Sequence, residues 1–211
     1  MTLPTPPLLL ITDRTQARHP LAAIARAAFR AGCRWLSLRE KDLAPDARLA
    51  LLAELVALAR PYRAHIMVHG DIAAAAAAGA AGVHLPSGGS VEEARMRLGA
   101  EALIGLSTHT GDEVSAAARA GADYVTLSPI FATASKPGYG PALGLDALAR
   151  ARQGAAVPIL ALGGITAANA AACLEAGAAG LAVMGTVMAA QDPEAAMAAI
   201  LAAFDQGGRS R

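Results

Sequence analysis

Short apolar runs recur along the chain and alternate with longer segments in which apolar and small residues follow the 3.6-residue period of a helix. Each run has the length of a strand that is buried on both faces of a parallel sheet. The predicted odd-numbered strands are Leu8–Thr12, Ile66–His69, Leu103–Ser107 and Ile159–Leu162. The predicted helices are Leu21–Ala31, Asp46–Arg60, Ile72–Ala78, Val91–Leu98, Gly111–Ala120, Leu145–Arg152, Ala167–Glu175 and Pro193–Phe204.

The even-numbered strands end four copies of a motif in which Ala-Gly is followed within a few residues by an apolar run, at 31–38, 78–85, 120–127 and 176–183. A glycine that ends a helix in a left-handed turn before a buried strand explains the motif. Strands and helices that alternate eight times predict an α/β fold, a single (β/α)8 TIM barrel over residues 1–211 with a disordered tail from about 205. An open doubly wound sheet is the alternative, but the chain lacks G-x-G-x-x-G after its first strand.

The composition favours an enzyme over a nucleic-acid-binding or membrane protein. Hydrophobic residues make up 55% of the chain, aromatic residues only 3%, and the net charge is +1. No basic run is interleaved with aromatic residues, which argues against nucleic acid or an anionic membrane as partner. The N-terminal apolar run is too short for a signal peptide or a membrane span, so a cytoplasmic enzyme is expected. Cys33 and Cys173 lack metal-ligand spacing and are expected to be buried thiols. A homo-oligomeric state is possible, and the sequence does not decide it.

Two glycine turns near the end of the chain predict a phosphate site. Gly163-Gly164 and Gly185 each follow a buried strand and precede a hydroxyl residue, Thr166 or Thr186, where a helix is expected to start. Glycine lets the backbone approach a ligand, and the unpaired N–H groups at a helix start carry partial positive charge. A pair of ordinary strand–helix turns is the alternative, but two such turns late in a barrel sequence favour phosphate binding.

Cations and histidines follow three other strands. Ser37, Arg39 and Lys41 share one face if the second strand keeps its pleat, and cations at a strand end suit an anionic substrate; an exposed charged loop is the alternative. His69 ends the third strand, before an Asp71 that is expected mainly to cap the next helix. Ser107 and His109 share one parity at the fifth strand, and an imidazole there suits proton transfer. Spacing alone leaves His109 equally compatible with a solvated or core histidine.

The longest connection follows the sixth strand and is rich in Gly and Pro. Loops of this length often bind or cover a ligand. The candidates to bind a carboxylate there are Thr133, Ser135 and Lys136.

Five motifs, R-E-K (39–41), G-V-H-L (82–85), G-x-S-x-H-T (105–110), T-x-S-K (133–136) and G-G-I-T (163–166), resemble the thiamine phosphate synthase superfamily, and within it the thiazole tautomerases. The resemblance runs from Ile11 to Thr186. It implies that Arg39 and Lys41 contact a pyrophosphate and that His109 is an acid–base residue. It also implies that the thiazole and its phosphate are held by Thr133, Ser135, Lys136, Gly164, Gly185 and Thr186.

The carboxylates that hold Mg²⁺ in the synthases of this superfamily are replaced here. The chain has His69-Gly70 in place of Asn-Asp, and Gly88-Gly89 at a second acidic position. Because Mg²⁺ takes oxygen ligands, no metal site and no cofactor are predicted. The leading hypothesis is therefore a metal-independent thiazole tautomerase that aromatises a thiazole carboxylate phosphate, with His109 and Lys41 as catalytic residues.

Two alternatives are kept. The first is a thiamine phosphate synthase, which joins thiazole phosphate to hydroxymethylpyrimidine pyrophosphate, releases pyrophosphate and requires Mg²⁺. The second is a non-catalytic paralogue that binds a phosphorylated ligand. In each case the expected partner is a small phosphorylated thiazole.

Overall fold

The strands form a closed barrel in which every strand is parallel to its neighbours. The computed structural model describes residues 2–133 and 141–207, and in them the strand order follows the sequence, with the last strand paired to the first. The (β/α)8 prediction is therefore confirmed. The strands are β1 (Leu8–Ile11), β2 (Trp35–Leu38), β3 (His65–His69), β4 (Gly82–Leu85), β5 (Leu103–Thr108), β6 (Tyr124–Leu127), β7 (Ile159–Leu162) and β8 (Gly180–Val183).

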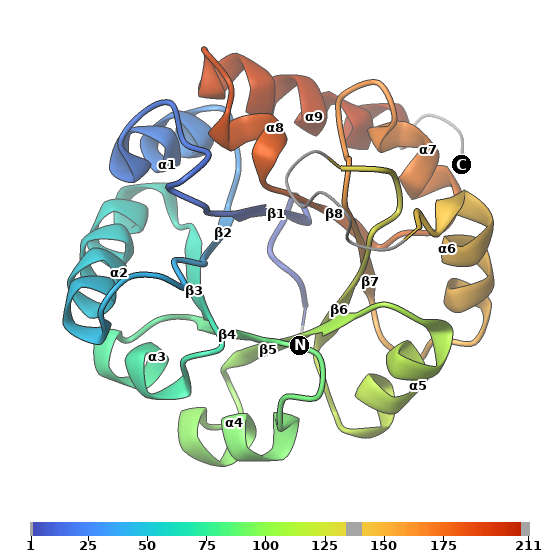
Figure 1. Ribbon diagram of the computed structural model, residues 1–211, viewed down its shortest axis with the longest axis horizontal. Helices are drawn as coiled ribbons and strands as arrows, with labels where there is room; N and C mark the ends of the chain where they lie inside the picture. Colours follow the sequence, from blue (N-terminus) through green and yellow to red (C-terminus); the bar gives the residue numbers. More distant parts are fainter. Residues whose placement is uncertain (1, 134–140, 208–211) are drawn as a thin grey trace.

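The helices form a ring outside the barrel (Figure 1). They are α1 (Leu21–Arg30), α2 (Pro45–Ala59), α3 (Ile72–Ala78), α4 (Val91–Leu98), α5 (Gly111–Arg119), α6 (Gly144–Gln153), α7 (Ala170–Glu175), α8 (Gly185–Met188) and α9 (Pro193–Gly207), with a 3₁₀ turn at Arg60–Tyr62. The short α8 lies over the ends of β8 and β1, whereas α9 packs between α1 and α7 and closes the ring (Figure 1).

Two separate apolar cores follow from the alternation of side chains along the strands. One face of each strand packs against the helices, as Leu8, Leu10, Leu36 and Leu38 do. The other face fills the barrel interior, with Leu9, Trp35, Met67 and Tyr124 among its members. The rings of Trp35 and Tyr124 meet edge to face with centroids 4.7 Å apart, a geometry that adds about 0.5–1.5 kcal/mol beyond buried area.

Three differences from the predicted helices exceed a shift of one residue at a boundary. The helix after β7 starts at Ala170 rather than Ala167, because Asn169 bonds back into the preceding turn instead of letting the helix begin earlier. The extra helix α8 starts directly at Gly185. The last helix continues past Phe204 to Gly207, so the expectation of a disordered tail from about 205 is wrong for these residues.

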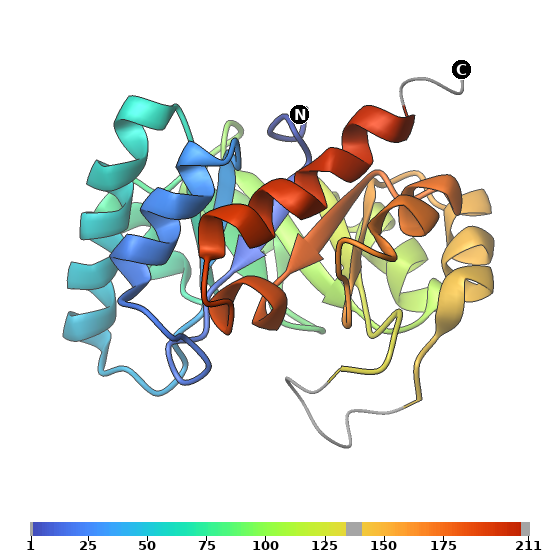
Figure 2. The same ribbon diagram turned by 90° about the horizontal axis from the view of Figure 1, so that it is seen from above.

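The carboxyl ends of the strands, where barrels of this class hold their sites, lie on one side of the molecule. Figure 2 shows β8 pointing to the side on which α8 lies, while the N-terminal segment and the end of α9 lie on the other side. Both cysteines are buried free thiols, as expected. None of the helices in the described ranges is long and apolar enough to cross a membrane.

Candidate functional site

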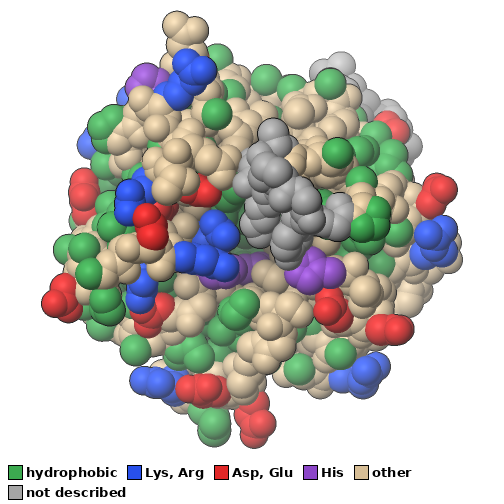
Figure 3. Space-filling model, viewed as in Figure 1, with side chains coloured by type: hydrophobic (Ala, Val, Ile, Leu, Met, Phe, Trp, Pro, Cys, Tyr) green, Lys and Arg blue, Asp and Glu red, His purple; other side chains and the backbone are tan. Residues whose placement is uncertain are grey.

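A pocket of about 810 Å³, counted up to its open mouth, lies at the carboxyl ends of the strands. Figure 3 shows histidine, lysine and arginine side chains gathered at the centre of this face. The predicted site residues that line the pocket are Arg39, His69, Ser107, His109, Thr133, Gly163, Gly164, Gly185 and Thr186.

The two glycine turns lie side by side on one wall of this pocket. Thr186 Oγ1 donates to the Ile165 carbonyl over 2.6 Å, which ties the turn after β8 to the turn after β7. Thr186 was expected to offer its hydroxyl hydrogen to a phosphate, but that hydrogen is used here. The first N–H groups of α8 have no partner inside the helix, so the backbone is left as the donor to an anion.

Gly163 and Gly164 are glycines because another part of the chain passes against them. Their φ angles are +98° and +65°, and a Cβ on Gly164 would lie 2.5 Å from the Ala132 carbonyl oxygen. The β6–α6 connection therefore packs directly on this turn. Asn169 holds the turn from the other side, since its Nδ2 donates to the Gly164 carbonyl over 2.9 Å. Sequence reasoning assigned these glycines to a ligand and missed this packing.

A second, cationic pocket adjoins the first, and Arg39 and His69 line both. Lys41 and Arg48 line the second pocket only. Arg48, a residue that sequence reasoning missed, donates from Nη2 to Asp71 over 2.6 Å. Asp71 also caps α3 by accepting from the Ala74 amide, as expected. Although burial raises the pKa of Asp71, the Ala74 amide and the Arg48 guanidinium outweigh that effect and lower it below its usual value.

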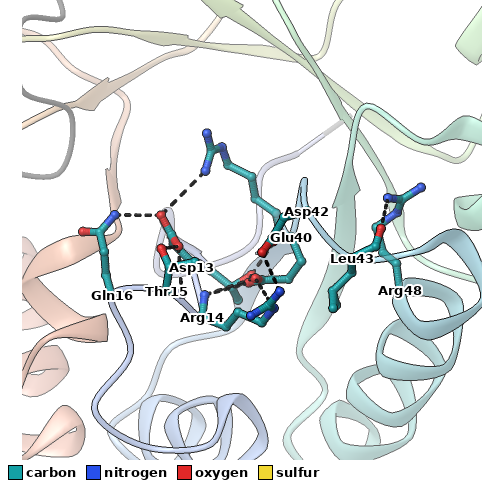
Figure 4. Close-up of polar contacts among 10 residues, drawn as sticks. Asp13, Arg14, Thr15, Gln16, Glu40, Asp42, Leu43 and Arg48 are labelled. Atoms are coloured by element: carbon teal, nitrogen blue, oxygen red, sulfur yellow. Dashed lines mark hydrogen bonds and ion pairs between the residues drawn. The ribbon is translucent and has the colours of Figure 1, made fainter.

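Glu40 lies between Arg39 and Lys41 in the sequence but faces the protein. Its carboxylate is 2% exposed and accepts from the Thr12 hydroxyl over 2.7 Å and from the Arg14 amide over 3.1 Å. Thr12 Oγ1 in turn accepts from the Arg39 amide over 2.9 Å. Figure 4 shows Glu40 reached by Arg14 on the loop that follows β1. This network fixes the backbone that carries the two cations.

Glu40→Ala is expected to destabilise the fold by about 1–3 kcal/mol, because the Thr12 hydroxyl and the Arg14 amide lose their buried acceptor. The midpoint of urea unfolding measures the effect. Glu194→Ala is the matched control, since Glu194 accepts from Arg30 over 2.7 Å with its side chain 43% exposed and exposed pairs contribute about 0–1 kcal/mol. Equal shifts for the two variants would contradict the buried role of Glu40.

His109 projects into the first pocket from the end of β5. Its Nδ1 lies 2.9 Å from the Ser128 carbonyl oxygen. A carbonyl oxygen only accepts, so in the neutral ring Nδ1 carries the hydrogen and the basic lone pair is on Nε2. The His109 amide also donates to Glu113. The ring is thus oriented by β6 and the backbone by α5, which places a base at the pocket wall.

His84 lines the pocket and Tyr124 contacts it from the barrel interior, and sequence reasoning gave neither a role. Their side chains are 2% and 0% exposed. The His84 Nδ1 lies 2.9 Å from the Tyr124 hydroxyl, and its Nε2 lies 3.0 Å from Ser107 Oγ. Burial lowers the pKa of His84 to about 4 and raises the pKa of Tyr124 well above its usual value. Both groups are therefore neutral near pH 7.

One described site residue lies elsewhere. Ser37 was expected to bind substrate, but it is 1% exposed and lines neither pocket. Its position on the interior face was anticipated; its depth was not. Its Oγ has no hydrogen-bond partner. Ser135 and Lys136 lie outside the described residues.

The carboxylates that line the second pocket already have partners within the protein. No group of three or more His, Cys, Asp or Glu side chains in residues 2–133 and 141–207 is placed to hold a metal ion. Glu40 and Asp71 line the second pocket, but Thr12 and Arg14 engage the first carboxylate, and Arg48 and α3 the second. The donor set that Mg²⁺ prefers is therefore already committed to protein contacts.

The barrel, with pockets at the carboxyl ends of its strands, has the architecture of (β/α)8 enzymes, and comparison with known proteins gives its family. The family model described as thiamine monophosphate synthase matches residues 8–187. A putative thiamine-phosphate synthase of Geobacter sulfurreducens is 40% identical over 197 residues, which cover 92% of each chain. A thiamine-phosphate synthase of Anaeromyxobacter dehalogenans is 43% identical over 190 residues, which cover 90% of this chain and 85% of the relative.

A solved structure agrees with this result. Thiamine phosphate pyrophosphorylase from Pyrococcus furiosus superposes with a TM-score of 0.85 and 28% identity, covering 94% of this chain and 95% of that one. The chain belongs to the thiamine monophosphate synthase family and is an enzyme of thiamine biosynthesis.

Proposed function

We propose that this enzyme joins thiazole phosphate to hydroxymethylpyrimidine diphosphate and releases pyrophosphate. The observation that carries the proposal is the pair of adjoining pockets that share Arg39 and His69. Two adjoining compartments suit a reaction with two substrates. The relatives that are about 40% identical and named thiamine-phosphate synthase support the same reaction. The condensation is therefore better supported than the tautomerase reaction, which sequence reasoning placed first.

In this proposal the first pocket binds the thiazole phosphate. The phosphate lies against the two glycine turns, where the N–H groups at the start of α8 face the ligand. Apolar side chains such as Ile11 and Leu162 line the same pocket and suit the thiazole ring. A single pocket thus offers both an anion site and an apolar surface.

The second pocket binds the diphosphate. Arg39, Lys41 and Arg48 line it, and guanidinium groups hold phosphate oxygens with paired hydrogen bonds. The reaction forms a C–N bond to the thiazole and breaks the C–O bond to the diphosphate, so negative charge grows on the leaving group. Arg39 and Lys41 offset part of that charge, while Arg48 in the same pocket is already paired with Asp71. The family implies Mg²⁺, which would supply further neutralisation when bound, but the carboxylates of the pocket do not fit it.

The second candidate is isomerisation of a thiazole carboxylate phosphate. The observation that favours it is the orientation of His109, whose Nδ1 is held by the Ser128 carbonyl so that Nε2 is basic. Such a base suits movement of a proton within one ligand. The carboxylates of the second pocket favour this candidate too. They are engaged by protein groups rather than left for Mg²⁺, and isomerisation needs neither Mg²⁺ nor a diphosphate site.

Purified protein given both substrates of the condensation is expected to release pyrophosphate, and the thiazole carboxylate phosphate alone is the parallel assay for isomerisation. Both are run with and without EDTA. Arg39→Ala is expected to lower pyrophosphate release by about 10- to 150-fold, the effect of losing a hydrogen bond to a charged group. Arg30→Ala, which removes an exposed pair with Glu194, is the control and is expected to have no effect.

Turnover in the isomerisation assay alone would replace the condensation by the second candidate. Binding of thiazole phosphate without turnover in either assay would instead favour a non-catalytic ligand-binding paralogue.

A further inference from the structure

A chain of polar side chains crosses the barrel interior directly beneath the first pocket. The Tyr124 hydroxyl lies 2.9 Å from His84 Nδ1 and 3.5 Å from Met67 Sδ. On the other side of the ring, His84 Nε2 lies 3.0 Å from Ser107 Oγ, which lines the pocket. Buried polar groups of this kind are costly unless every member finds a partner. Here the partners come from β3, β4, β5 and β6.

The strands leave space for this chain. A Cβ on Gly105 would lie 2.1 Å from Tyr124 Cζ, so the phenol reaches His84 only because β5 has a glycine at this point. The ring of His84 also stacks on His69, with centroids 5.5 Å apart and an interplanar angle of 28°. His84 is thus held on its face by His69 and at both nitrogens by hydroxyl groups.

Thr126 Oγ1 also lies 3.4 Å from His84 Nε2, at the long end of hydrogen-bond distances, so Ser107 at 3.0 Å is taken as the partner of that nitrogen. With this pairing, two arrangements of hydrogens satisfy the distances to Tyr124 and Ser107. In the first, the Tyr124 hydroxyl donates to Nδ1, and Nε2–H donates to Ser107 Oγ. In the second, Nδ1–H donates to the phenol oxygen, the phenol hydrogen turns to Met67 Sδ, and Ser107 donates to Nε2. A thioether sulfur is a weak acceptor, and Met67 Sδ already accepts from Trp35 Nε1 over 2.8 Å. The first arrangement is therefore the more stable.

We propose that His84 is a positioning residue that fixes Ser107 as a hydrogen-bond donor to the substrate. With Nε2–H donating to Ser107 Oγ, the hydroxyl hydrogen of Ser107 points away from His84 and toward the pocket. The substrate atom over Ser107 is then an acceptor, such as a ring nitrogen or an anionic oxygen, because the hydroxyl hydrogen is the group that Ser107 presents to the pocket.

The tautomer of His84 tests the proposal in the ligand-free protein. Long-range ¹H–¹⁵N correlation spectra distinguish a ring protonated at Nε2 from one protonated at Nδ1, and His84→Gln identifies the His84 signals by their loss. The expected result is hydrogen on Nε2 and a hydrogen-bonded lone pair on Nδ1. In Tyr124→Phe the donor to Nδ1 is absent, and a change in the His84 nitrogen shifts is expected. A wild-type ring protonated at Nδ1 would overturn the proposal.

A double-mutant cycle measures whether the chain acts through Ser107. Tyr124→Phe and Ser107→Ala are made singly and together, and KM and kcat are measured in whichever reaction the protein performs. Coupled residues deviate from additivity by about 2- to 150-fold in kcat/KM, and such coupling is the expected result. Independent effects would overturn the proposal. Tyr62→Phe, at a tyrosine whose ring contacts Phe29 outside both pockets, is the matched control.

His84→Gln keeps an N–H donor for Ser107 and is expected to retain more activity than His84→Leu, whereas a merely space-filling role predicts the reverse. The inference rests on the proposed function only in taking the first pocket as the substrate pocket. The spectra report on His84 whether or not either reaction is found, so the two ideas fail separately.

Discussion

Replacement of His109 by alanine is expected to lower kcat for isomerisation of the thiazole carboxylate phosphate by about 10²–10⁴-fold, the contribution of a positioned general base. The reason is the contact of Nδ1 with the Ser128 carbonyl, which leaves the basic lone pair on Nε2. The condensation moves no proton between carbon atoms, so its kcat is expected to change far less. Steady-state kinetics of both reactions therefore separate the two candidate functions with one variant.

His19→Ala is the control for this comparison. His19 is exposed, lies 3.0 Å from the Gln191 carbonyl oxygen through Nε2, and lines neither pocket. Its replacement is expected to leave both reactions unchanged. An isomerisation rate that is the same in His109→Ala as in the unaltered enzyme would remove His109 from the mechanism.

Replacement of Gly164 by alanine is expected to weaken binding of thiazole phosphate by about 10- to 150-fold, the range for loss of a hydrogen bond to a charged group. The new methyl group would lie 2.5 Å from the Ala132 carbonyl oxygen at a φ of +65°, so the turn must move away from the β6–α6 connection. The displaced turn no longer aligns with the start of α8. Overpacking of this kind also costs about 1–3 kcal/mol of stability, which a urea titration measures alongside the calorimetric affinity.

Gly79→Ala separates strain from displacement. Gly79 has a φ of +61°, and a Cβ there would meet nothing within 4 Å. This variant carries nearly the same backbone strain outside both pockets, so it is expected to lose stability while its affinity for thiazole phosphate is unchanged. Equal affinities of the Gly79 and Gly164 variants would mean that the glycine turn does not hold the phosphate.

The fold could be predicted because a strand buried on both faces leaves a plain record in the sequence. Leu8–Ile11 and Ile159–Leu162 are uninterrupted apolar runs, and such runs need helices on one side and a filled interior on the other. The boundary at α7 could not be predicted in the same way. Thr166 has the residue type of a helix start, but its amide donates to the Asn169 side chain and the helix begins only after Asn169.

The site was only partly predictable, for a related reason. Their positions at the ends of strands predicted Arg39, His69, Ser107 and His109 as site residues, and all four line the first pocket. The alternation of side chains along a strand does not indicate how deeply a residue is buried, and Ser37 is buried and lines neither pocket. The function of Glu40 depends on contacts with the loop after β1.

The role of His84 could not be predicted either, although the residue belongs to the G-V-H-L motif. Its partners Tyr124 and Ser107 are brought to it from other strands by the closed barrel. Contacts between residues on different strands follow no fixed spacing that can be recognised in a single sequence.

The side of the barrel on which the N-terminal segment and the end of α9 lie has a practical consequence for handling the protein. The N-terminal segment and the end of α9 lie on the opposite side of the barrel from the strand ends that hold the pockets (Figure 2). An affinity tag, a fluorescent reporter or a surface tether attached at either end therefore leaves the mouth of the enzyme facing solution. Immobilised preparations for calorimetry or sensor measurements can thus be made in either orientation without shielding the ligand's route of entry.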